Sequence, residues 1–243
     1  MSAGQGRTPR LHTDCDLPGR IDLTDKQAHY LRSVMRLSPG DTICVFNGRD
    51  GEYDAVLEGS GKRIWALALE TAQRRPQTPH PSLALAFAPL KQARLDYMVE
   101  KAAEMGAGTV IPVLTQHGQV RKVNRHRLRA NMIEACEQCG ILNVPEIVEP
   151  LTLPALLGNV EGRTLVVADE ALAGDEMDAV AAIRAARAPL TVLIGPEGGF
   201  SDNEREMLAP RAVRVSLGPR VLRADTAAVA LLALVEAAHP SVA

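Results

Sequence analysis

Two stretches near the carboxyl end of the chain decide its fold. Residues 190–201 read LTVLIGPEGGFS, and residues 212–226 read AVRVSLGPRVLRADT. Each begins with an apolar run typical of a buried strand, passes through a glycine-bearing loop and continues into a helical pattern. Glycine at the end of a strand lets the backbone approach a ligand closely, and ligands bind at the carboxyl edge of open α/β sheets. The two loops therefore predict one shared pocket for a flat, nucleoside-like molecule.

The rest of the carboxyl-terminal part alternates strand-like and helix-like segments. Apolar runs predict strands at 83–88, 109–114 and 163–168, and helical patterns predict helices at 92–105, 124–139, 177–186 and 225–238. Such alternation is typical of an α/β domain whose mostly parallel sheet is covered by helices on both faces. The last helix is apolar on nearly every side, so we expect it to be buried inside the domain or against another subunit.

The amino-terminal part of the chain opens on a helix-start pattern. Thr24 and Gln27 are spaced as in a capping box, in which each side chain bonds to the backbone N–H of the other residue. The pattern predicts a helix from this point to Leu37. Its apolar residues are expected to share one buried face: Ala28, Leu31, Val34 and Met35.

Strand-like runs follow at 42–47, 52–58 and 63–71, separated by glycine-rich hairpin breaks. This order predicts a small β-barrel with one helix. Three prolines within residues 74–82 mark a linker. We therefore expect an amino-terminal domain over residues 1–75 and the α/β domain over residues 82–243.

Composition bounds the class of protein. At 243 residues the chain can bury a sizeable core, and with 46% hydrophobic but only 3% aromatic residues that core must be aliphatic. No apolar run is long enough to span a membrane, since the best candidate, 227–238, is short and contains Glu236. The first 16 residues lack the apolar stretch of a secretory signal, and four cysteines make no disulfide framework. We expect a soluble, cytoplasmic protein.

Basic residues gather in two places, although the net charge of the chain is −2. No acidic residue lies between Glu104 and Glu134, a window that holds Arg121, Lys122, Arg125, Arg127, Arg129, His117 and His126. A second cluster comprises Lys26, His29, Arg32 and Arg36. Either cluster alone is also typical of a solvated helix face, but two clusters in two domains favour a shared polyanion such as nucleic acid.

The first glycine loop does not fit the common nucleotide-binding patterns. It lacks the Gly-Lys-Ser/Thr of a triphosphate-binding loop and the spacing of a dinucleotide fingerprint. A bare strand-to-turn role is one interpretation, but Glu197 has little structural reason to lie in such a turn. Cys136 and Cys139 have no second pair to complete a zinc site and fall near a helix end, so packing is favoured and no metal is expected.

Two arginines bracket the second glycine loop. Arg220 and Arg223 are followed closely by Asp225 and Thr226. The guanidinium groups could pair with Asp225 or Glu197, or they could hold an anionic base or a phosphate in a bidentate fashion. Thr226 could equally be the N-cap of the final helix. The sequence leaves these alternatives open.

Taken together, the two loops resemble a known family. Segments 194–199 and 217–223 are similar to those of the RsmE family, ribosomal RNA uridine-N3 methyltransferases of the trefoil-knotted SPOUT class. The likeness covers nearly the whole chain. Segments 29–36 and 39–41 resemble the PUA-like RNA-binding domain of that family, and Lys91, 101–106, 134–140 and 144–146 match further family segments.

The resemblance implies a fold, a cofactor and partners. The fold is a SPOUT α/β trefoil-knot domain with a mostly parallel sheet, preceded by a small PUA-like β-barrel. S-adenosylmethionine would be bound by the two glycine loops and the last helix, and an obligate homodimer would grip small-subunit (16S) ribosomal RNA, with no metal and no membrane involved. The expected cofactor-binding residues are Leu193, Gly195, Pro196, Glu197, Gly199, Leu217, Gly218, Val221, Leu222 and Thr226. The expected RNA-binding residues are Lys26, Arg32, Arg36, Arg121, Lys122, Arg125 and Arg220.

Methylation of uridine N3 sets the chemistry that such a site needs. The N3 proton must be lost, and the resulting negative charge spreads over N3 and the two carbonyl oxygens. Arg223 is suited to stabilise that charge, because a guanidinium stays protonated and presents a planar fork of donors. Glu197 or Asp225 would orient this group or accept the proton. These three are the predicted catalytic residues.

Three places depart from the family pattern. Thr115-Gln116-His117-Gly118 stands where the family usually has Thr-Glu-Arg-Ser, and Ile141 stands where it usually has arginine. Ala224-Asp225 in place of Thr-Glu is a milder change. Two alternatives stay open, and the two missing arginines motivate the first of them. One is a catalytically weak SPOUT-fold RNA-binding or ribosome-assembly factor, and the other is a SPOUT methylase of another RNA base.

Overall fold

The structure is a computed structural model that describes residues 8–60, 63–160, 162–174 and 178–240. The chain divides into two compact units. The first comprises Met1–Pro79 with Cys136–Asn143, and the second comprises His80–Ala135 with Val144–Ala243. No helix among the described residues has the length and the apolar character that crossing a membrane requires.

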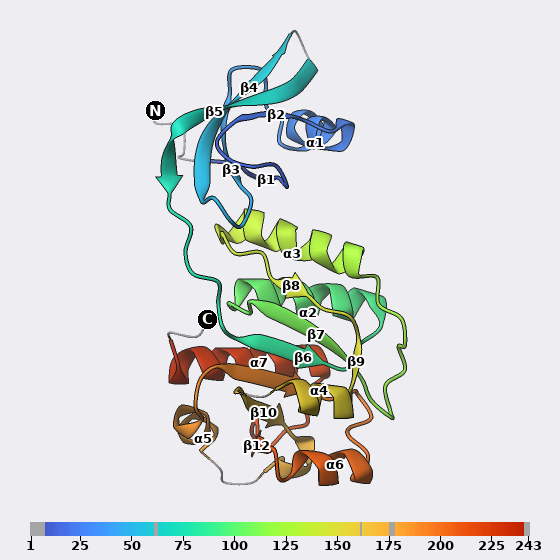
Figure 1. The fold of residues 1–243 in the computed structure, drawn as a ribbon. Coiled ribbons are helices and arrows are strands. Elements are labelled where there is room, and N and C mark those ends of the chain that lie inside the picture. Colours follow the sequence, from blue (N-terminus) through green and yellow to red (C-terminus); the bar gives the residue numbers. More distant parts are fainter. Residues whose placement is uncertain (1–7, 61–62, 161, 175–177, 241–243) are drawn as a thin grey trace. The chain divides into compact units, whose positions relative to one another are not determined.

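The first unit is built on a five-stranded sheet (Figure 1). Its strands, in the spatial order β1-β3-β4-β5-β2, are β1 (Arg10–His12), β3 (Thr42–Phe46), β4 (Glu52–Ser60), β5 (Arg63–Arg75) and β2 (Arg20–Asp22). β1 pairs with β3 in parallel, and the other neighbours are antiparallel. Aliphatic side chains of this sheet form the core of the unit, among them Ile43, Val45, Leu57 and Leu67.

The helix of the first unit begins as predicted and continues differently. Thr24 and Gln27 form the capping box that opens α1 (Asp25–His29). A π-helical segment, η1 (Tyr30–Val34), follows directly, and the N–H of Met35 bonds to the carbonyl of Tyr30 five residues back. This wider turn shifts the register, so Leu31 is buried but Val34 is 61% exposed. The predicted buried face is therefore wrong at Val34.

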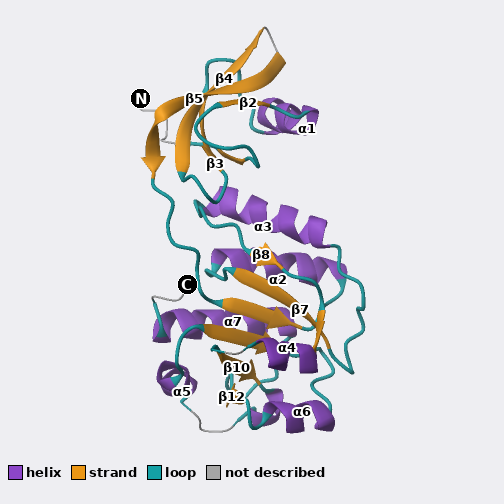
Figure 2. Cartoon of the chain, in the orientation of Figure 1, coloured by secondary structure: helices purple, strands orange, loops and turns teal. Residues whose placement is uncertain are grey.

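The second unit contains a parallel sheet with helices on both faces (Figure 2). In spatial order its strands are β12 (Ala212–Val215), β10 (Thr164–Ala168), β11 (Leu190–Ile194), β6 (Ala84–Phe87), β7 (Thr109–Leu114) and β8 (Glu146–Ile147), and β9 (Leu151–Thr152) pairs with β7. Every pair is parallel. The predicted α/β class is confirmed, and the loops that follow β10, β11 and β12 share one edge of the sheet.

Seven helical elements accompany this sheet among the described residues. They are α2 (Gln92–Glu104), α3 (Arg125–Cys139), α4 (Leu153–Asn159), the 3₁₀ turn η2 (Glu170–Leu172), α5 (Ala179–Ala185), α6 (Asp202–Leu208) and α7 (Ala224–Ala238). Leucines of α4 and α6 pack against Leu165, Val167 and Leu193 of the sheet. α7 contacts β11, α2 and α5. The last turn of α3, from Cys136, is grouped with the first unit.

The apolar helix α7 finds most of its partners within its own chain. Leu231, Leu232 and Val235 are fully buried in the single chain. Solvent still reaches Asp225, Glu236, Ala238 and a stripe along the helix that comprises Thr226, Val229, Ala230, Ala233, Leu234 and Ala237. The helix was expected to be buried inside the domain or against another subunit. Burial inside the domain accounts for Leu231, Leu232 and Val235.

Cys136 is a packing residue in the structure. Its side chain is fully buried, its thiol donates to the Asn143 carbonyl at 3.6 Å, and burial raises its pKa to about 12. A thiol with such a pKa stays protonated at neutral pH and is a poor nucleophile and metal ligand. Among the described residues no group of three His, Cys, Asp or Glu side chains gathers as around a metal ion.

Candidate functional site

A cavity of about 540 Å³ lies at the carboxyl edge of the parallel sheet in the second unit. Loops from three neighbouring strands form its wall, together with the start of α7 and one residue of α2. The lining residues are Arg94, Ala168, Asp169, Glu170, Ala173, Ile194, Gly195, Pro196, Glu197, Gly198, Leu217, Gly218, Arg220, Val221, Leu222, Arg223, Ala224 and Ala227. Both predicted glycine loops are among them, so the shared pocket exists.

The loop after β11 is shaped by its own side chains. A Cβ atom added to Gly195 would lie 2.8 Å from the ring of Phe200, which is 4% exposed. The absence of a side chain at Gly195 therefore lets Phe200 pack against the loop, a role different from the predicted close approach of a ligand. Gly199 has φ +71°, and Ser201 and Glu204 form a capping box that opens α6.

The loop after β12 leaves space at its centre. Gly218 lines the cavity with φ +102°, and a Cβ atom added there would meet no atom within 4 Å. Glycine is required by this backbone conformation, and the space beside it is open to a ligand. The Gly218 N–H is held by the Ser216 hydroxyl at 3.3 Å.

The loop after β10 carries a buried carboxylate that holds two arginines. Asp169 has a side chain 2% exposed; Oδ1 accepts from Arg205 and from the Ala171 N–H, and Oδ2 accepts from Arg214 at 2.8 Å. Burial alone would raise the pKa of Asp169, but these hydrogen bonds outweigh it and hold the pKa below its usual range. Arg205 also donates to the Phe200 carbonyl at 3.1 Å and to Glu170 at 3.1 Å. One guanidinium thus joins the loops after β10 and β11.

We expect Asp169→Asn to lower the free energy of unfolding by about 2–3 kcal/mol at pH 7. The neutral amide leaves the partly buried guanidinium of Arg214 without its counter-charge, and it leaves Arg205 with Glu170 alone. Because the folded-state pKa is depressed, the carboxylate stabilises the fold above its unfolded pKa of about 4, and this contribution disappears as the pH falls through the folded value. Urea melts between pH 3 and pH 7 should show the two proteins converging in acid. Asp202→Asn, a change at an exposed carboxylate, is the control and should have little effect.

Arginine side chains line the cavity as well. Arg94 of α2 pairs with Glu197 at 2.6 Å. Asp225 accepts from the Thr226 N–H, and Arg223, not Thr226, is the N-cap residue of α7. Among the residues that the structure describes, neither Arg220 nor Arg223 forms an ion pair. The alternative in which Arg223 pairs with Asp225 or Glu197 is not the arrangement seen.

The chain is similar to known RNA methyltransferases. Residues 76–236 match the family described as the RNA methyltransferase domain, and residues 23–66 match the RNA methyltransferase PUA domain. A relative from Rickettsia conorii, ribosomal RNA small subunit methyltransferase E, is 33% identical over 219 residues, which is 89% of each chain. The chain belongs to the ribosomal RNA small subunit methyltransferase E family. The resemblance found in the sequence is confirmed.

Solved structures agree with this family. Ribosomal RNA small subunit methyltransferase E from Neisseria gonorrhoeae, bound to S-adenosyl methionine, has a TM-score of 0.81 at 25% identity, with 95% of this chain and 98% of that chain covered. A Legionella pneumophila protein in complex with bound SAM has a TM-score of 0.83 at 27% identity, with 96% and 98% covered. The predicted fold class, a SPOUT-type α/β domain with a PUA-like β domain before it, is confirmed.

The structure brings many of the predicted site residues together. Those that line the cavity are Gly195, Pro196, Glu197, Leu217, Gly218, Arg220, Val221, Leu222 and Arg223. Leu193 is buried in β11, Gly199 ends the first loop, and Asp225 and Thr226 lie in the first turn of α7, all outside the cavity wall. Arg121, Lys122 and Arg125 belong to the second unit, and Lys26, Arg32 and Arg36 to the first.

The loop after β10 and Arg94 are the lining groups that sequence reasoning missed. Asp169 and Glu170 come directly after a predicted strand, and the rule that ligands bind at the carboxyl edge of a parallel sheet could have found them. Arg94 lies in the first turn of α2, just after the loop that follows β6, and β6 neighbours β11 in the sheet, so the same rule could have placed it at this edge.

Proposed function

We propose that this protein is a cytoplasmic enzyme that transfers a methyl group from S-adenosylmethionine to N3 of a specific uridine in small-subunit (16S) ribosomal RNA. One observation carries the proposal. In a member of an RNA methyltransferase family, two arginines without an ion pair among the described residues line a cavity formed by glycine-bearing loops. A pocket with this charge suits a reaction in which a neutral base becomes an anion.

The cavity suits the cofactor in size and lining. Its volume of about 540 Å³ falls in the range of small-molecule sites, and apolar side chains line it beside exposed backbone. The space beside Gly218 is available to a nucleoside, while Leu217, Val221 and Leu222 offer apolar contacts. When bound, S-adenosylmethionine supplies an electrophilic methyl group on its sulfonium, which N3 takes as the carbon–sulfur bond breaks.

The residues of the chain act on the uridine. Arg223 stabilises the negative charge that appears on N3 and the carbonyl oxygens as the proton leaves. Glu197 is the proposed proton acceptor, because it lines the cavity whereas Asp225 does not. Arg94 pairs with one carboxylate oxygen of Glu197 at 2.6 Å and would thereby fix the position of this carboxylate in the cavity wall.

RNA is held by the basic residues of both units. The side chains proposed to bind phosphate are Lys26, Arg32, Arg36, Arg121, Lys122, Arg125 and Arg220, and all but the half-buried Arg125 are exposed. Because each neutralised phosphate releases counterions, RNA affinity should fall steeply as salt rises.

We further propose a homodimer through the stripe of α7 that solvent reaches in the single chain. Ala233→Glu places a charge on this stripe, and we expect it to give monomers that stay folded, measured by sedimentation equilibrium and thermal melting. Leu231→Glu should instead unfold the chain, because Leu231 is fully buried within it. Ala181→Glu, at an exposed position of α5, is the matched control and should keep the dimer. A dimeric Ala233→Glu variant would place the interface elsewhere.

Methylation of small-subunit RNA by the purified protein tests the proposed reaction. RNA incubated with methyl-labelled S-adenosylmethionine should yield label in N3-methyluridine after digestion to nucleosides. Label in another nucleoside would favour a methylase of another base. If calorimetry detects RNA binding but no binding of S-adenosylmethionine, the RNA-binding or assembly factor becomes the better interpretation.

A further inference from the structure

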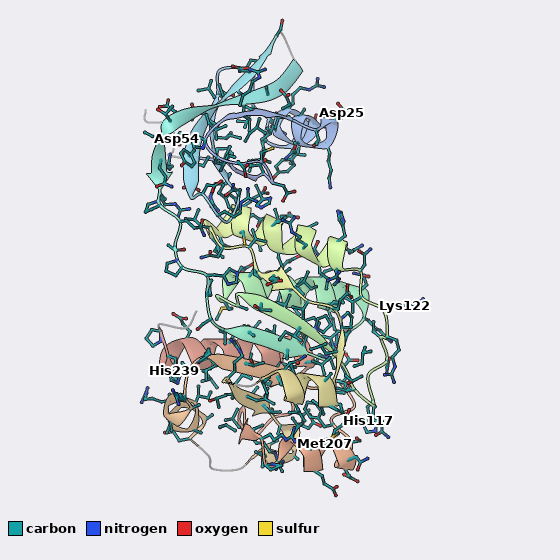
Figure 3. All side chains as sticks on the ribbon, viewed as in Figure 1. Asp25, Asp54, His117, Lys122, Met207 and His239 are labelled. Carbon is teal, nitrogen blue, oxygen red and sulfur yellow. The ribbon has the colours of Figure 1, made fainter. Side chains whose placement is uncertain are left out.

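The turn between β7 and α3 lies against the glycine loop that follows β11. The carbonyl of Thr115 accepts from the N–H of Gly118 at 3.2 Å, which closes a tight turn with His117 at its third position. This is one of the places where the sequence departs from the family pattern, with histidine where the family usually has arginine. Figure 3 labels His117 at the edge of the second unit.

A buried carboxylate anchors the turn to the end of the glycine loop. Glu204 is 6% exposed, and its Oε1 accepts from the N–H of Gln116 at 2.8 Å. Its Oε2 accepts from the N–H of Ser201 at 2.9 Å. The backbone beside His117 is thus fixed relative to the residue that follows Phe200.

The imidazole of His117 makes a second contact between the turn and the loop, to the backbone of Gly198 and Gly199. Nδ1 lies 3.2 Å from the carbonyl oxygen of Gly198 and 3.0 Å from that of Gly199. Carbonyl oxygens only accept hydrogen bonds, so Nδ1 carries the proton and donates to both. A Cβ atom added to Gly198 would lie 3.3 Å from the Cβ of His117, so the side chain also packs against the loop.

We propose that His117 is a positioning residue that fixes Gly198 and Gly199, and with them Glu197, in the conformation that binds the cofactor. Two adjacent glycines have more backbone freedom than any other pair, and ordering them on binding would weaken affinity. The hydrogen bonds from His117 restrict this backbone freedom before the cofactor binds. This inference rests on the proposed S-adenosylmethionine site, and it gives a role to a residue that departs from the family pattern.

Substitutions at His117 test the inference by calorimetry with S-adenosylmethionine. We expect His117→Ala to raise the Kd about fivefold, as loss of one net hydrogen bond does. His117→Asn keeps an N–H donor near the position of Nδ1 and should stay within about twofold of wild type, whereas His117→Gln places its donor near Nε2 and should not. His126→Ala, the same change at an exposed histidine of α3, should leave the Kd unchanged.

Amide hydrogen exchange of the ligand-free protein gives an independent readout. We expect exchange at Gly199 and Ser201 to be faster in His117→Ala than in wild type and to return toward wild type in His117→Asn. Wild-type affinity and exchange in His117→Ala would overturn the inference, as would a common loss in all three variants that tracks melting temperature. If wild type itself fails to bind S-adenosylmethionine, the proposed function fails. The exchange comparison still tests whether His117 orders the backbone of Gly198 and Gly199.

Discussion

Arg223→Ala is expected to slow methyl transfer about a hundredfold or more while S-adenosylmethionine binds with nearly unchanged affinity. Arg223 lines the cavity and forms no ion pair among the described residues. As the N-cap residue of α7 it makes no side-chain capping bond, so the fold has little use for its guanidinium. In the proposed reaction its charge would matter most when uridine N3 loses its proton, and an interaction felt in the transition state lowers turnover more than binding.

Single-turnover rates, cofactor affinity and melting temperature measured on that variant separate catalysis from structure. Arg223→Lys should recover part of the rate, because a point charge cannot span N3 and a carbonyl oxygen as the guanidinium fork does. Arg220→Ala is the matched control in the same cavity. It should weaken RNA binding and keep the rate at saturating RNA within about tenfold of wild type. A parallel loss of melting temperature and cofactor affinity in Arg223→Ala would make Arg223 a structural residue.

Gly218→Val is expected to raise the Kd for S-adenosylmethionine about a hundredfold. The backbone at Gly218 has φ +102°, and the space that the new side chain would fill is the cavity itself. A branched side chain therefore excludes the cofactor and also strains the backbone, which costs about 1–3 kcal/mol of stability.

A second glycine of the chain separates these two effects. Gly40 has φ +94° and equally open surroundings, but it lies in the first unit. Gly40→Val should lower the melting temperature by a similar amount and leave the Kd at the wild-type value, measured by calorimetry. If Gly218→Val folded and bound the cofactor normally, the loop after β12 would not form the site.

The sequence predicts the elements that periodicity marks strongly. The strands Thr109–Leu114 and Leu190–Ile194 have the predicted bounds, because each is a mostly aliphatic run of the kind that is typical of a buried parallel strand. Short elements lack such a signal. β8 and β9 are two residues each, and α4 is a seven-residue helix whose burial depends on the sheet that it covers.

The candidate site likewise has parts that the local sequence predicts and parts that it does not. Glycine loops after predicted strands identify two walls of the cavity, since local sequence determines where a strand ends. The pairing of Arg94 with Glu197 spans 103 positions, and the contact of His117 with Gly199 spans 82. Such contacts depend on how helices and turns pack on the sheet, which no local pattern encodes. The predicted burial of Val34 was wrong for a local reason instead. The chain forms a π-helical turn there, and a pattern based on 3.6 residues per turn does not anticipate it.

The most direct measurement of the central claim is mass spectrometry of nucleosides from 16S ribosomal RNA. A strain that lacks this protein is compared with the same strain carrying the wild-type gene on a plasmid. We predict that N3-methyluridine is absent from the first and restored in the second, with the other methylated nucleosides unchanged. An unchanged level of N3-methyluridine in the strain without the protein would contradict the proposed reaction.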